Sequence, residues 1–310
     1  MSKIRPVVIY PFVQPKNLGG LEHLFGYLKT LLDDKHFTKP TTIINYQTMY
    51  RSHTPHAVDN RISETYERTI AEIVRPVSEV AHTWAVDTCA MWLKGLGEAF
   101  QHAQARHEYH DVFWLIPGDF NYASAEGHTA TSKLSEIPLK VKESACEICL
   151  GEVEVPLNSA KQLIDTYGTY GLLYNWFPAE AQGIRKLTSK PRTEFFALNY
   201  QTLERALVES RWFAYEQTLM ILLQNMNGRD PARRMMAVPL GKITDDESTR
   251  SSLASAMAQV ERTERALKLF WRERAEREGR TNWHDEFRVL DGQSESVRTA
   301  AMVILRRLLS

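Results

Sequence analysis

The densest run of hydrophobic residues lies in residues 111–121 and stops abruptly at one carboxylate, Asp119. The run is rich in β-branched and aromatic residues, and Pro117-Gly118 closes it. Such a run is typical of a strand buried on both faces, as in a parallel sheet. Open α/β sheets bind ligands at the carboxyl ends of their strands. We therefore expect Asp119 either to hold a cation at that edge or to cap the turn that follows.

Other segments alternate between strand and helix patterns. Residues 5–11 and 41–46 are short apolar runs that indicate buried strands, and residues 17–20 open a helix with apolar positions three and four residues apart. From about residue 57 to 105 the pattern is mostly helical, with an interruption near Pro76. This alternation predicts a parallel sheet with right-handed crossovers, that is, an α/β fold.

The end of the chain has a different pattern. From Leu253 onward, apolar residues recur at helical spacing among Glu, Arg and Lys, which predicts a helical extension. Residues 241–246 are polar and turn-rich, so we expect a linker between a domain over 1–240 and a helical extension over 247–310. The apolar stripe of this helical extension must be buried, either against the sheet or against a second copy of the chain. We expect a homodimer in which the extension contributes to the contact.

Composition narrows the function. The chain has 310 residues, 43% of them hydrophobic and 25% charged, with a formal net charge of zero, which disfavours a nucleic-acid-binding protein. Its three cysteines have no further ligands at zinc spacing, so we expect ordinary thiols in a reducing compartment. Neither a signal sequence nor an apolar stretch of about 20 residues is present. We expect a soluble, cytoplasmic protein without a transmembrane segment.

Several segments together resemble family-2 glycosyltransferases of the GT-A fold. Residues 7–21 are similar to the first strand and turn of that family, and residues 85–103 look like the helix before its metal-binding strand. Residues 115–121 then fall where the family has its Asp-x-Asp motif. Residues 193–203 and 211–219 resemble the Cys-Gly-Phe-Arg segment and the Trp-Ala-Phe-Asp/Glu-x-Glu-Leu helix start of the polyprenol-phosphate sugar transferases.

The resemblance implies a GT-A-like, Rossmann-type, mostly parallel sheet flanked by helices. It implies a metal-dependent hexosyltransferase that takes a sugar from a nucleotide-diphosphate sugar, with Mg²⁺ or Mn²⁺ on Asp119. Phe12 offers an aromatic face for the nucleotide base or packs in the core, and Gln14 offers an amide for the base or lies in a solvated loop. Lys161 could touch a phosphate. The full set of donor residues that we expect is Pro11, Phe12, Gln14, Asn45, Gly118 and Lys161.

Candidates for the acceptor side lie in the middle of the chain. Tyr170 and Trp176 could stack on a sugar ring or belong to the core. Lys190 and Arg192 suit either an anionic acceptor or a structural ion pair. In this fold Glu194 would face the acceptor and could act as general base. A further acid, Glu216, stands at a helix start, where it would orient the site or complement the helix dipole.

The chain departs from the family pattern at several places. At the end of the second strand, where the family has Asp-Asp-Gly-Ser, this chain has Asn45. Pro117 replaces the first acid of Asp-x-Asp. A longer segment before the metal strand suggests an inserted helix around residues 59–74. These departures keep open a degenerate GT-A-like binding or scaffold protein without catalysis. A sugar-phosphate nucleotidyltransferase is also open, although residues 17–20 are a poor version of its glycine-rich loop.

Overall fold

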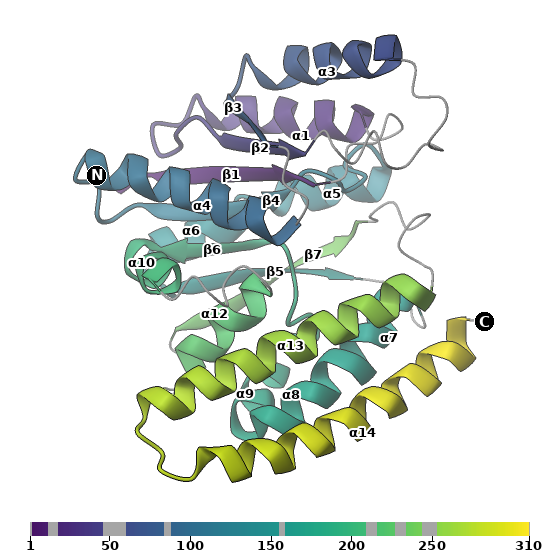
Figure 1. Cartoon of the computed structure of the whole chain (residues 1–310). Helices are drawn as coiled ribbons and strands as arrows, with labels where there is room; N and C mark the ends of the chain where they lie inside the picture. Colours follow the sequence, from purple (N-terminus) through teal and green to yellow (C-terminus); the bar gives the residue numbers. More distant parts are fainter. Residues whose placement is uncertain are drawn as a thin grey trace. The chain divides into compact units, whose positions relative to one another are not determined.

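The structure is a computed structural model that forms two compact units (Figure 1). It describes residues 2–11, 18–45, 60–83, 88–154, 159–208, 216–226, 234–243 and 253–309. The first of the two units, here called the sheet unit, comprises Met1–Glu154, Thr193–Val208 and Arg233–Asp246. The second, the helical unit, comprises Val155–Arg192, Glu209–Ala232 and Glu247–Ser310. These units differ from the expected ranges 1–240 and 247–310, because helices from the middle of the chain pack with the C-terminal pair.

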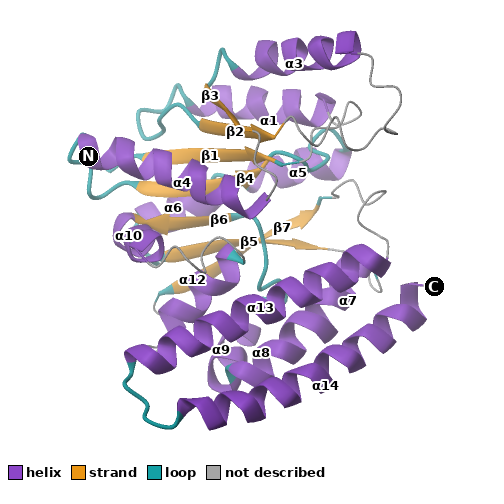
Figure 2. Ribbon diagram, in the orientation of Figure 1, coloured by secondary structure: helices purple, strands orange, loops and turns teal. Residues whose placement is uncertain are grey.

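A mostly parallel sheet forms the centre of the sheet unit (Figure 2). Within the described residues its strands lie in the order β3-β2-β1-β4-β6-β5-β7. Their bounds are Ile4–Tyr10 (β1), Thr41–Asn45 (β2), Glu79–Thr83 (β3), Val112–Pro117 (β4), Ile148–Glu154 (β5), Phe196–Asn199 (β6) and Met235–Lys242 (β7). Among these strands only β6 runs antiparallel to its neighbours. The predicted α/β class is confirmed.

Helices cover the two faces of this sheet. They are α1 (Leu18–Leu31), α3 (Asn60–Val74), α4 (Thr88–Ala105), α5 (Ala125–Lys133), α6 (Glu136–Lys142) and α10 (Tyr200–Val208). On one face α4 lies so close that a Cβ at Gly95 would be 2.9 Å from Val7 and 2.8 Å from Ile9. On the other face Val8 and Trp114 pack in one core with residues of α1 and α6. Successive side chains along each strand thus pack on opposite faces, and both faces are covered, which explains the continuous apolar runs in β1 and β4.

Most predicted elements of the sheet unit are present. The strands β1, β2 and β4, the first helix and the inserted helix α3 all lie where they were expected. The interruption predicted near Pro76 is present, but the strand that follows it was not predicted: Glu79–Thr83 forms β3 and pairs in parallel with β2. That strand has only five residues and mixes polar with apolar side chains, so it gives no clear periodic signal. The linker prediction also starts too early, since Gly241 and Lys242 belong to β7.

The helical unit collects two C-terminal helices and several shorter ones. Its elements are α7 (Ala160–Leu163), a π-helical turn η2 (Ile164–Thr169), α8 (Tyr170–Trp176), α9 (Pro178–Leu187), α12 (Gln217–Met226), α13 (Leu253–Arg277) and α14 (Trp283–Leu309). Gly168 lets η2 approach α13, because a Cβ there would be 2.6 Å from Val260. No helix among the described residues is long and apolar enough to span a membrane.

The apolar stripe of the C-terminal helices is covered within its own unit. Leu267 and Phe270 are buried, and both α13 and α14 pack on α8. Neither expected cover, the sheet or a second copy, is needed to explain this burial. Because the stripe is covered, it gives no reason to expect a homodimer, and dimerisation stays a prediction without structural support.

Candidate donor and metal site

Three parallel strands end side by side at one edge of the sheet. Ile9 of β1 lies opposite Pro117 of β4, and Tyr10 lies opposite Ile44 of β2. The residues that follow these ends, or close them, are Pro11, Asn45, Gly118 and Asp119, so the structure brings these predicted residues to one edge. Pro11, Asn45 and Asp119 are buried there. Two further donor candidates, Phe12 and Gln14, lie outside the described residues.

Gly118 joins β4 to this edge through close backbone contact. Its amide donates a 2.6 Å hydrogen bond to the Ile9 carbonyl oxygen, which extends the β1–β4 pairing past the end of the strand. A Cβ at this position would lie 3.2 Å from Tyr10 Cβ and 3.3 Å from Ile9 O, tighter than ordinary packing. A glycine therefore lets the chain turn directly after β4 and places Asp119 beside the end of β1.

The reversed direction of β6 brings Glu194 to the same edge. Phe196, the first residue of β6, pairs with Leu115 near the end of β4, so the residues before Phe196 lie at the carboxyl edge. Thr193 Oγ1 donates a 2.6 Å hydrogen bond to Gly151 O, and Gly151 N donates a 2.8 Å bond to Phe195 O. The rings of Phe120 and Phe195, neighbours of the two acids, meet with centroids 5.0 Å apart. Asp119 and Glu194 are thus both placed at the edge by the sheet itself.

Tyr122 lies close to both acids. Its side chain is fully buried, and its hydroxyl donates a hydrogen bond to the Pro117 carbonyl oxygen. Burial, and then the negative charges of Asp119 and Glu194, raise the pKa of Tyr122 well above its ordinary value. The phenol is therefore neutral at any physiological pH and can act only through its hydrogen bond and its shape.

Asp119 fits a divalent cation in its chemistry, and Glu194 is a second acid at the same edge. The Asp119 side chain is 3% exposed, and Oε2 of Glu194 is buried with no hydrogen-bond partner among the described residues. Carboxylate oxygens are the donors that Mg²⁺ and Mn²⁺ prefer. No cluster of three or more His, Cys, Asp or Glu suited to a metal occurs in the described part of the chain. The diphosphate and water could supply further ligands to a cation held here.

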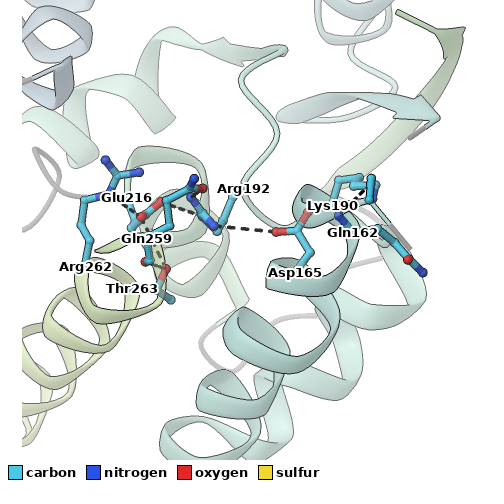
Figure 3. A network of polar contacts seen from close by, with 9 residues as sticks. Gln162, Asp165, Lys190, Arg192, Glu216, Gln259, Arg262 and Thr263 are labelled. Carbon is cyan, nitrogen blue, oxygen red and sulfur yellow. Dashed lines mark hydrogen bonds and ion pairs between the residues drawn. The ribbon is translucent and has the colours of Figure 1, made fainter. Parts of the chain in front are cut away.

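A second group of charged residues lies within the helical unit (Figure 3). Glu216, just before α12, accepts from Arg192 Nε at 3.2 Å and from Arg262 Nε at 2.9 Å. Asp165 of η2 lies 4.0 Å from both Lys190 Nζ and Arg192 Nη1. Gln259 and Thr263 of α13 complete the network with hydrogen bonds to Arg192 and Glu216. The predicted residues Lys190, Arg192 and Glu216 are thus brought together.

The two carboxyls of this network differ electrostatically. Burial would raise the pKa of Glu216, but Arg192 and Arg262 outweigh it, so this pKa lies below its ordinary value. Burial raises the pKa of Asp165, and Arg192, Lys190 and Lys161 offset this only in part. Lys161, a predicted phosphate contact, therefore acts on Asp165. Glu216 remains ionised and pairs with two guanidinium groups, so it does not have the properties of a proton acceptor.

Tyr170 and Trp176 occupy the interior of the helical unit. Each is 2% exposed. The Tyr170 hydroxyl donates to Thr188 O at 2.5 Å, and Trp176 Nε1 donates to Ser294 Oγ at 3.0 Å. The Trp176 ring also packs on Trp271, with centroids 6.0 Å apart. The structure favours the core interpretation of both residues over stacking on a sugar ring.

Sequence reasoning did not find Tyr122, Asp165 or Arg262. Tyr122 follows the predicted strand end by a few residues, and only its inward turn gives it a role. Asp165 and Arg262 are far apart in the sequence, and each joins the network through another residue: Asp165 lies near Arg192, and Arg262 pairs with Glu216. A cluster built from four separate segments leaves no local spacing that a sequence motif could reveal.

Comparisons with known proteins support the fold. No protein-family model matches the chain, and no curated protein matches it. Mannosyl-3-phosphoglycerate synthase from Rubrobacter xylanophilus has a similar structure, with a TM-score of 0.52 and 10% sequence identity over 91% of this chain and 76% of that one. Glucosyl-3-phosphoglycerate synthase from M. tuberculosis has a TM-score of 0.53 and 11% identity over 87% of this chain and 80% of that one.

A further structure of the M. tuberculosis enzyme contains Mn²⁺, UDP-glucose and phosphoglyceric acid. It has a TM-score of 0.50 and 11% identity, with 87% of this chain and 80% of that one covered. At this identity the likeness concerns the fold alone. Together with the strand order and the single antiparallel strand β6, it shows that the chain has a GT-A-like fold.

Proposed function

We propose that the chain is a glycosyltransferase that transfers a sugar from a nucleotide-diphosphate sugar, with a divalent cation on Asp119. The observation that carries this proposal is the placement of Asp119 directly after β4, beside the ends of β1 and β2 in a GT-A-like sheet. The carboxyl edge of such a sheet is where ligands bind. A buried acid at this edge, with Glu194 close by, supports a cation and diphosphate site.

On the donor side, the residues at the strand ends would bind the nucleotide. The buried amide of Asn45 can both donate and accept hydrogen bonds, and the close turn at Gly118 leaves backbone groups near a ligand. Phe12 and Gln14 remain sequence-based candidates for the base. Asp119 would hold the cation, which when bound supplies positive charge to the leaving diphosphate. Glu194 is the candidate to take the proton from the acceptor hydroxyl as that oxygen bonds to the sugar carbon.

For the acceptor, we propose a small molecule that carries phosphate or carboxylate groups. In the helical-unit network four cationic side chains face two carboxylates, which leaves an excess of positive charge. Lys190 and Arg192 would contribute to binding such an anion. The similar structures are those of phosphoglycerate synthases, one of them with phosphoglyceric acid bound, and the polyprenol-phosphate transferases that segments of the sequence resemble also act on a phosphate. Both likenesses agree with an anionic acceptor.

A thermal-shift panel of nucleotide-diphosphate sugars with and without Mn²⁺ tests the proposal. A ligand at a hundred times its Kd adds about 2.7 kcal/mol of stability. We expect Mn²⁺-dependent stabilisation of the wild type and its loss in Asp119→Asn. The exposed Asp33→Asn is the matched control and should respond like the wild type.

Two results would count against this function. If Asp119→Asn folds and still shows the full Mn²⁺-dependent shift, Asp119 does not hold the cation. If the wild type binds donor but releases no nucleotide diphosphate with any phosphate- or carboxylate-bearing acceptor, the chain is a binding protein without catalysis. A panel without any shift would reject the nucleotide-sugar site itself.

A further inference from the structure

The turn that carries Asp119 is held between two helices at positions where no side chain fits. A Cβ at Gly20 of α1 would lie 2.9 Å from Phe120 O and 3.2 Å from Tyr122 N. At Gly127 of α5, a Cβ would overlap the Asn121 carbonyl oxygen and lie 2.8 Å from Tyr122 C. Real Cβ atoms essentially never come so close. Both helices therefore contact the backbone of residues 120–122 directly.

Tyr122 closes the same turn from inside the protein. Its hydroxyl donates to the carbonyl oxygen of Pro117, the last residue of β4, so one hydrogen bond spans the whole segment from strand end to tyrosine. The Tyr122 amide donates a further 3.0 Å hydrogen bond to Phe120 O. The ring is fully buried and 6.5 Å from the Phe120 ring. The segment between Pro117 and Tyr122 is thus closed by a side-chain bond to its own beginning.

We infer that Tyr122 is a positioning residue for Asp119: its hydrogen bond to Pro117 fixes the turn of residues 118–121 in the shape that presents the carboxylate to a cation and diphosphate. This inference rests on the proposed function. A site with Pro117 in place of an acid has fewer carboxylates than the family pattern, so its affinity depends more on how rigidly the remaining one is held. Binding groups held in place before the ligand arrives lose less conformational entropy on binding.

Tyr122→Phe is a sharp test because it removes only the hydroxyl. The phenol is neutral, so no charge changes, and the buried ring stays. Tyr27→Phe is the matched control: the Tyr27 hydroxyl also bonds a backbone group, but its partner is Ser135 N, at 3.3 Å, which lies outside the turn. Two properties are measured on the full chain: amide hydrogen exchange of residues 118–121 without ligand, and the affinity for UDP with and without Mn²⁺.

We expect Tyr122→Phe to speed exchange at residues 118–121 and to weaken Mn²⁺-dependent UDP binding by about tenfold, the factor that corresponds to one buried hydrogen bond. Metal-free UDP binding should be unchanged, and high Mn²⁺ should restore full stabilisation, because Asp119 is still present. Tyr27→Phe should change neither property. A merely structural role for Tyr122 would lower stability without this selective effect on the metal-dependent affinity.

The outcomes separate the inference from the proposed function. Unchanged exchange in Tyr122→Phe, or faster exchange with wild-type Mn²⁺-dependent affinity, overturns the inference. A wild type without Mn²⁺-dependent UDP binding rejects the proposed function, and with it the positioning role. If Tyr122→Phe does not fold, Gly20→Ala perturbs the same turn and should give the same two changes. Its matched control is Gly19→Ala, where a Cβ makes only an ordinary 3.8 Å contact with Ala123.

Discussion

The sheet unit and the helical unit use buried carboxylates in opposite ways. In the sheet unit Asp119 and Glu194 lie at one edge because β4 and β6 run in opposite directions. The charges of both acids act on the neutral phenol of Tyr122. In the helical unit Glu216 lies between two guanidinium groups. The first pair of acids is placed by the backbone, and Glu216 is placed by its counter-ions. In the first arrangement Glu194 Oε2 has no hydrogen-bond partner among the described residues, whereas both oxygens of Glu216 accept hydrogen bonds from arginine side chains.

A second contrast lies inside the helical unit itself. Arg192 and Arg262 approach Glu216 to 3.2 and 2.9 Å, whereas the cations nearest Asp165 stand 4.0 Å away. The shorter contacts outweigh burial, and the longer ones do not, so the pKa of Glu216 falls and that of Asp165 rises. Glu216 is therefore a structural anchor. Arg192 is shared between the two acids, so Lys190, 4.0 Å from Asp165, is the better candidate to bind an anionic ligand.

The largest effect that we expect in this comparison comes from Glu216→Gln. The change leaves Arg192 and Arg262 without their buried counter-charge, and breaking a buried ion pair in this way costs about 3 kcal/mol or more. Urea unfolding at pH 7 should show this loss for the helical unit. Asp165→Asn removes a carboxyl that is partly destabilised by burial and should cost clearly less.

The pH dependence of this difference has a definite sign. The pKa of Glu216 is lowered in the folded protein, so its contribution is present above the unfolded value of 4.5 and is lost as the pH falls through the folded value. The gap between wild type and Glu216→Gln should therefore be full at pH 7 and shrink below about pH 4.5. A gap that stays constant into acid, or an equal cost for Asp165→Asn, would contradict the contrast drawn between the two acids.

The sequence predicts the sheet unit better than the helical unit, for a physical reason. Strands such as β1 and β4 carry their own signal, because each is buried on both faces and reads as a continuous apolar run. The end of such a run fixes where Asp119 lies. Glu194 could be proposed only from a resemblance, since its place depends on β6, four residues long and reversed in direction.

Tertiary packing decides what the sequence leaves open in the helical unit. Tyr170 and Trp176 have the same residue types that a sugar-binding site would use, and only the packing of α8 against α13 and α14 shows that they are buried. The apolar stripe of the C-terminal helices is also covered by neither of the two expected partners, the sheet or a second copy of the chain. Its cover comes from helices some 80 residues earlier, which no local pattern connects to the end of the chain.

The second-largest effect that we expect is a loss of stability in the sheet unit. Gly127→Ala should destabilise it by about 1–3 kcal/mol, the usual cost of an added group in a fully packed place. Here the neighbours are the backbone of Asn121 and Tyr122, which cannot rotate away as a side chain can. The same variant should weaken Mn²⁺-dependent nucleotide binding, because the displaced residues follow Asp119 directly.

Gly97→Ala is the matched control for this variant. Gly97 also lies in a helix of the sheet unit, α4, but a Cβ there meets nothing within 4 Å. Alanine is the better helix former, so this change should stabilise by up to about 1 kcal/mol. Opposite signs for the two substitutions in chemical denaturation would support the close backbone contact at Gly127. Equal signs would show that the turn adapts to α5.

The smallest effect concerns a pair of like groups, which sharpens the contrast with the opposite charges around Glu216. His23 of α1 and His128 of α5 stack with ring centroids 3.9 Å apart. Burial, and then the charge of His128, lower the pKa of His23 below 6.5.

In His128→Gln we expect the pKa of His23 to rise toward 6.5 in an NMR titration, since the second cause is removed. A lowered pKa in a base means that folding loses stability as the pH falls below 6.5, so His128→Gln should lose less than the wild type between pH 7.5 and 5.5. The exposed His102→Gln on α4 should behave like the wild type. If the His23 titration does not move in His128→Gln, burial alone lowers its pKa and the stacked pair has no electrostatic role.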